Sequence, residues 1–99
     1  MKLALFARLE AKPGNEKDVA DFLRQGLALA NEESTTLMWF ALRLGPTTFA
    51  IFDTFADEAG RQRHLGGPIA QALMAQAPTL LAAPPQIEPL EVLGAKLPG

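Results

Sequence analysis

Polar and apolar residues alternate along residues 2–10, which is the period of a β-strand. One face of this segment carries Leu3, Leu5, Ala7 and Leu9. Lys12-Pro13-Gly14 follows and ends the strand. Over residues 15–31 the apolar positions change to helical spacing, which predicts a helix with Asn15 at its N-terminal cap.

Two runs rich in Thr, Phe and Ile, residues 35–44 and 47–55, flank Gly45-Pro46 and predict a β-hairpin. A loop made of Gly45 and Pro46 alone sets the pairing of the two strands. Under that register the pairs are Leu44 with Thr47, Leu42 with Phe49, Phe40 with Ile51, and Met38 with Asp53. Each side chain of the hairpin is thereby assigned to one face of the sheet.

The last part of the chain predicts two helical segments and a final strand. Asp57 or a neighbour caps a short helix over residues 59–65, and Pro68 suits the first turn of the next helix. Pro78 kinks or ends that helix. Residues 86–93 form the last strand, in which Pro89 favours an edge position because it cannot donate to a ladder.

The order strand, helix, strand, strand, helix, strand predicts an α+β, ferredoxin-like split βαβ fold in one domain, residues 1–99. Right-handed crossovers place the helices on one face of a four-stranded antiparallel sheet. The other face is then expected to carry apolar and basic side chains that water alone does not suit. It includes Phe6, Arg8, Trp39, Arg43 and Phe52. A second copy of the sheet is the simplest cover, so we expect a homodimer with these residues inside its barrel.

The sequence resembles the antibiotic biosynthesis monooxygenase-like branch of the dimeric α/β barrel superfamily. The residues that carry the resemblance are Lys12-Pro13-Gly14 after the first strand, the stretch 49–59, and His64-Leu65. The resemblance covers nearly the whole chain. It implies a homodimer with two sheets facing each other, and a pocket between sheet and helices in each subunit.

Members of that family include flavin-free monooxygenases of quinol-like or polyketide aromatics and haem-cleaving enzymes. This chain has Phe55 where the family often has Trp, and Ala7 where the haem-cleaving relatives have Asn. The resemblance therefore disfavours haem cleavage and implies chemistry without a cofactor.

His64, the only imidazole, is the candidate base for deprotonating a substrate, and the family pattern places a His here. Its alternative role is to stabilise the end of its helix. Asp53 is the lone carboxylate expected on the helix-covered face, and it is the candidate catalytic partner. Alternatively it pairs with Arg61 or Arg63, or caps the short helix.

A second set of residues can wall an aromatic substrate pocket or simply form core. These are the aromatic and thioether side chains Phe22, Met38, Phe40, Phe49 and Phe55.

Composition excludes several classes of function. Nine basic and eleven acidic residues without clusters argue against a nucleic-acid partner. No cysteine and one histidine leave no plausible transition-metal site and fit a cytoplasmic protein. The long uncharged stretch near the C-terminus is broken by prolines and argues against a membrane span.

The leading hypothesis is a cofactor-independent monooxygenase acting on a small apolar phenol or quinol. The alternatives are a non-catalytic dimer that binds a small hydrophobic molecule or acts as a scaffold, and an isomerase or lyase using one base.

Overall fold

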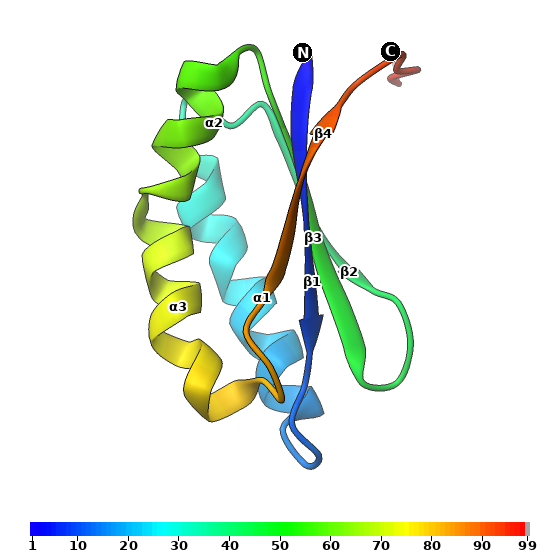
Figure 1. The fold of residues 1–99 in the computed structure, drawn as a ribbon, viewed down its shortest axis with the longest axis vertical. Helices are drawn as coiled ribbons and strands as arrows, with labels where there is room; N and C mark the ends of the chain where they lie inside the picture. Colours follow the sequence, from blue (N-terminus) through cyan, green and yellow to red (C-terminus); the bar gives the residue numbers. More distant parts are fainter. Residues whose placement is uncertain (99) are drawn as a thin grey trace.

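A computed structural model describes residues 1–98 and shows seven elements along the chain (Figure 1). They are β1 (Leu3–Glu10), α1 (Glu16–Asn31), β2 (Met38–Arg43), β3 (Thr48–Phe55), α2 (Glu58–Leu65), α3 (Pro68–Leu80) and β4 (Gln86–Glu91). The order confirms the predicted split βαβ pattern, with the second helical segment divided between α2 and α3. No helix in residues 1–98 has the length and hydrophobicity that a membrane span requires.

The four strands form one antiparallel sheet in the order β2-β3-β1-β4. All three helices lie on one side of it, which we call the helix face, and the other side is the open face (Figure 1). β4 is an edge strand, as Pro89 predicted, because a proline there removes no hydrogen bond from a central ladder.

The pairing of β2 with β3 differs from the prediction by one residue. Trp39 pairs with Asp53 and Phe40 with Phe52, in place of Met38 with Asp53 and Phe40 with Ile51. Because successive side chains of a strand point to opposite faces, a shift of one residue moves every β2 side chain to the other face.

The hairpin loop explains the shift. The amides of Leu44 and Gly45 donate to the carbonyl of Thr48, at 2.8 and 3.3 Å, so Leu44 does not pair with Thr47. The Thr47 carbonyl instead accepts from the amide of Ala11 at 2.9 Å. The side-chain hydroxyl of Thr47 donates to the carboxylate of Glu10 at 2.7 Å. Contacts with β1 thus draw Thr47 into the loop, which contains one residue more than expected.

The turn after β1 holds the C-terminal end of α3. Gly14 has a φ of +92°, a conformation that glycine adopts without the strain other residues incur. The side chain of Asn15 donates to the carbonyl of Thr79 at 3.0 Å, and the amide of Lys12 to that of Leu80 at 2.9 Å. Asn15 occupies the cap position of α1, but its side chain does not cap that helix as predicted. It satisfies a terminal carbonyl of α3 instead.

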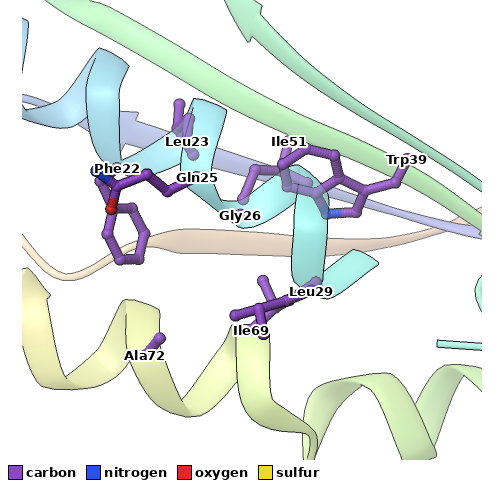
Figure 2. A pocket seen from close by; sticks show the side chains of 9 residues that line it. All are labelled: Phe22, Leu23, Gln25, Gly26, Leu29, Trp39, Ile51, Ile69 and Ala72. Carbon is purple, nitrogen blue, oxygen red and sulfur yellow. The ribbon is translucent and has the colours of Figure 1, made fainter. Parts of the chain in front are cut away.

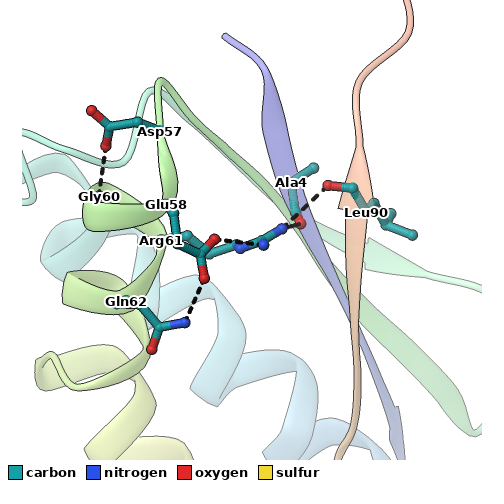
Figure 3. Close-up of polar contacts among 7 residues, drawn as sticks. All are labelled: Ala4, Asp57, Glu58, Gly60, Arg61, Gln62 and Leu90. Atoms are coloured by element: carbon teal, nitrogen blue, oxygen red, sulfur yellow. Dashed lines mark hydrogen bonds and ion pairs between the residues drawn. The ribbon is translucent and has the colours of Figure 1, made fainter.

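Arg61 ties α2 to the sheet (Figure 3). Its guanidinium donates to the carbonyls of Ala4 on β1 and Leu90 on β4, both at 3.3 Å, and forms an ion pair with Glu58. Asp57 caps the same helix by accepting from the amide of Gly60 at 2.9 Å, as predicted. These contacts fix α2, and with it the position of His64.

Candidate functional site

His64 and Asp53 are in direct contact on the helix face. Nε2 of His64 lies 2.8 Å from Oδ2 of Asp53, and both residues are buried. Asp53 comes from β3 and His64 from the last turn of α2. Asp53 therefore neither pairs with Arg61 or Arg63 nor caps α2, the alternatives considered from sequence.

The carboxylate of Glu33 contacts the other ring nitrogen of His64. Its Oε1 lies 2.7 Å from Nδ1 of His64 and accepts from the hydroxyl of Thr36 at 2.9 Å. Its side chain is 13% exposed, and the contact is partly buried. Sequence analysis missed Glu33, because it lies in the loop after α1, outside any periodic element that would assign it a direction.

The two carboxylates determine the charge of His64. Burial by itself lowers the pKa of an imidazole, but the hydrogen bonds with Asp53 and Glu33 outweigh it and raise the pKa of His64 above 6.5. With both ring nitrogens facing carboxylates, the imidazolium donates to each of them. Each ring nitrogen of His64 thus faces a carboxylate oxygen, and neither nitrogen is free to accept a proton from another group.

An apolar cavity of about 160 Å³ lies between the sheet, α1 and α3 (Figure 2). Its lining residues are Phe22, Leu23, Gln25, Gly26, Leu29, Trp39, Ile51, Ile69 and Ala72. In another protein, an engineered apolar cavity of similar size binds benzene. The cavity can accommodate a single aromatic ring.

The cavity and the buried charges are neighbours on the helix face. Ile51 and Ile69 line the cavity and also a smaller hollow beside Asp53 and His64. The cavity therefore adjoins Asp53 and His64 through these two side chains, and Trp39, which also lines the cavity, pairs with Asp53 in the sheet.

The predicted pocket residues divide into three groups. Phe22 lines the cavity, whereas Phe49 and Phe55 are buried core residues. The Phe55 ring lies 5.3 Å from that of His64, centroid to centroid. The placement of Met38 and Phe40 in this pocket was wrong, because the shifted register puts both on the open face.

The same shift in register moves two of the residues predicted for the dimer barrel to the opposite face of the sheet. Trp39 and Arg43 lie on the helix face, where Trp39 lines the cavity and the Arg43 guanidinium stands 4.6 Å from the centre of the Phe49 ring. Phe6, Arg8 and Phe52 lie on the open face, as predicted.

Several buried polar atoms in residues 1–98 have no hydrogen-bond partner. They are Oε2 of Glu33, Nε1 of Trp39, Oδ1 of Asp53 and Oγ1 of Thr54. No group of three or more His, Asp or Glu side chains in this part of the chain has an arrangement that could hold a metal ion.

Neither a protein-family model nor a curated protein matches the chain. A crystal structure of NE2512 from Nitrosomonas europaea, a protein of unknown function, matches 99% of this chain and 95% of that one. The sequence identity is 66% and the TM-score 0.96. This chain belongs to the family of NE2512.

The NE2512 family has the fold of the antibiotic biosynthesis monooxygenases. A candidate enzyme of that kind from Deinococcus radiodurans matches 98% of this chain and 99% of its own, at 19% identity and a TM-score of 0.78. Another, from Nitrosomonas europaea, matches 93% and 99%, at 12% identity and a TM-score of 0.82. The resemblance inferred from sequence is confirmed at the level of the fold.

Proposed function

We propose that the protein binds a small aromatic molecule in the cavity and oxidises it with molecular oxygen, as a cofactor-independent monooxygenase of an apolar phenol or quinol. The observation that carries the proposal is the apolar cavity beside the buried network of Asp53, His64 and Glu33. Apolar walls with a few polar groups are typical of sites for small molecules.

The proposed reaction needs only substrate and oxygen. Deprotonation of a hydroquinone gives an electron-rich anion that can transfer an electron to O₂. One oxygen atom enters the ring, the other leaves as water, and the substrate supplies all four electrons, so the product is a hydroxyquinone. The residue proposed to accept the proton is Asp53, which His64 holds in place beside the cavity.

Oxygen consumption with a panel of single-ring hydroquinones tests this function. We expect one O₂ per hydroquinone, with one labelled atom in the product when ¹⁸O₂ is used. Ala72→Phe fills the cavity from α3 and should abolish turnover. Ala75→Phe, at an exposed position of the same helix, is the matched control. Equal turnover in the two variants would place the reaction elsewhere.

A non-catalytic carrier of a small hydrophobic molecule is the second candidate. The observation that favours it is the engagement of both His64 nitrogens, which leaves the imidazole unable to act as a base in this arrangement. Trp39 is the only tryptophan and lines the cavity, so its fluorescence reports binding directly. Binding without oxygen consumption would support the carrier and exclude the oxygenase.

We also propose that the protein is a homodimer joined through the open face. Phe6, Phe52 and Phe40 form a row across three adjacent strands, and Phe40 is 43% exposed. A twofold-symmetric pairing of two such faces would bury the row. The cysteine-free sequence suits a reducing compartment, and we propose the cytoplasm.

A further inference from the structure

Two unsatisfied polar atoms belong to residues that stand side by side on the helix face. Trp39 on β2 and Asp53 on β3 are directly paired in the ladder. The indole Nε1–H is a donor without an acceptor, and Oδ1 of Asp53 is an acceptor without a donor. Directly paired residues in an antiparallel sheet have Cβ atoms about 5 Å apart.

Leaving both atoms unpaired is costly. A buried donor or acceptor without a partner has lost its hydrogen bond to water and gained none in return, which destabilises the folded protein. Asp53 is 1% exposed, so bulk water does not reach it. A group that accepts from Trp39 and donates to Asp53 would satisfy both atoms at once.

Trp39 lines the cavity, and Asp53 lines the smaller hollow that shares Ile51 and Ile69 with it. The indole ring forms part of the cavity wall, and its nitrogen lies on the side of the ring toward Leu29 and Ile69 (Figure 2). A hydroxyl meets the requirement, because it accepts through its oxygen and donates through its hydrogen. A carbonyl or an ether can only accept, and an ammonium can only donate.

We propose that a phenolic hydroxyl binds between Trp39 and Asp53, accepting from the indole Nε1–H and donating to Oδ1 of Asp53, while its aromatic ring occupies the cavity. This inference rests on the cavity of the proposed function and adds the group by which the ligand is recognised.

Asp53, His64 and Glu33 then have different roles in the buried network. Asp53 Oδ1 is the atom that meets the hydroxyl proton, and Asp53 Oδ2 is held by His64 at 2.8 Å. His64 and Glu33 are then positioning residues: they hold the Asp53 carboxylate in place without contacting the ligand. The proton passes to Asp53 when the phenol ionises.

Binding of p-cresol and p-xylene tests the proposal, because the two molecules have nearly the same shape and differ by a hydroxyl in place of a methyl group. The single indole N–H resonance of the protein gives the affinity and senses the hydrogen bond. We expect p-cresol to move this resonance downfield and p-xylene not to do so. Calorimetry should show that Trp39→Phe weakens p-cresol binding roughly threefold to tenfold more than it weakens p-xylene binding, because only p-cresol loses a hydrogen bond.

Asp53→Asn should weaken p-cresol binding in the same selective way. Thr54→Val is the matched control. It removes the neighbouring hydroxyl, which is also buried without a hydrogen-bond partner, but this hydroxyl belongs to the other face of β3. Equal weakening of both ligands by Trp39→Phe, or equal resonance shifts, would overturn the inference. Failure of both ligands to bind would overturn it together with the ligand cavity. Selective p-cresol binding without oxygen consumption would uphold it and exclude only the oxygenase.

Discussion

Gly26 of α1 lies against the indole ring of Trp39. A Cβ built on Gly26 would stand 3.4 Å from two carbon atoms of that ring, which is an ordinary van der Waals contact. The absence of a larger side chain at residue 26 lets the helix approach the sheet where the cavity forms.

Gly26→Ala is therefore expected to stabilise the protein. Alanine fits beside the indole and loses less backbone entropy in a helix, a gain of roughly 0.5 to 1 kcal/mol. Gly26→Leu should displace the indole and destabilise the protein. Urea unfolding of both variants checks the pair, and a loss of stability in Gly26→Ala would mean that the indole cannot accept even a methyl group.

The pH dependence of stability should report the charge on His64. Its folded pKa lies above the unfolded value of 6.5, so its stabilising contribution is complete below pH 6.5 and is lost as pH rises through the folded pKa. We expect the contribution of His64 to the free energy of unfolding to fall as the pH rises above 6.5.

The single histidine permits a direct test by NMR titration of the imidazole. Glu33→Gln removes one of the two carboxylates that raise this pKa, so the titration and the loss of stability should both move to lower pH. Glu32→Gln, at the neighbouring exposed position, is the control and should leave both curves in place. An imidazole pKa below 6.5 in the unaltered protein would contradict the charged network.

Asp57→Ala should destabilise the protein by about 1 kcal/mol, because the carboxylate caps α2 through the amide of Gly60. Asp18→Ala, an exposed acid in the first turn of α1, should have a smaller effect. Thermal unfolding followed by circular dichroism measures both variants. Equal losses would show that the Asp57 hydrogen bond adds nothing beyond charge near a helix terminus.

Phe52→Asp should convert the proposed dimer to a monomer or prevent folding, because it places a charge in the row of phenylalanines on the open face. Leu27→Asp is the matched control, since Leu27 is 48% exposed on α1, away from the sheet. Light scattering gives the mass of each variant. A monomeric mass for the unaltered protein at micromolar concentration would refute the dimer.

Much of the fold followed from sequence because local signals determine it. The alternation of polar and apolar residues predicted β1, helical spacing of apolar residues predicted α1, and Pro89 predicted the edge position of β4. Each of these signals depends only on residues that are neighbours in the sequence. The same signals placed Asp53 on the helix face and Phe6 and Phe52 on the open face.

The tertiary structure decided which side chains of β2 face the helices and which residues make up the site. Hydrogen bonds of Thr47 with Glu10 and Ala11 accompany one additional residue in the hairpin loop, which brought Trp39 to the cavity and took Phe40 away from it. Glu33 joined His64 because the loop after α1 passes beside α2, a contact between segments far apart in the chain. The sequence by itself determined the elements and the identity of the buried acid and base. Packing between distant segments decided which side chains meet, because loop register and helix placement depend on contacts that no local pattern encodes.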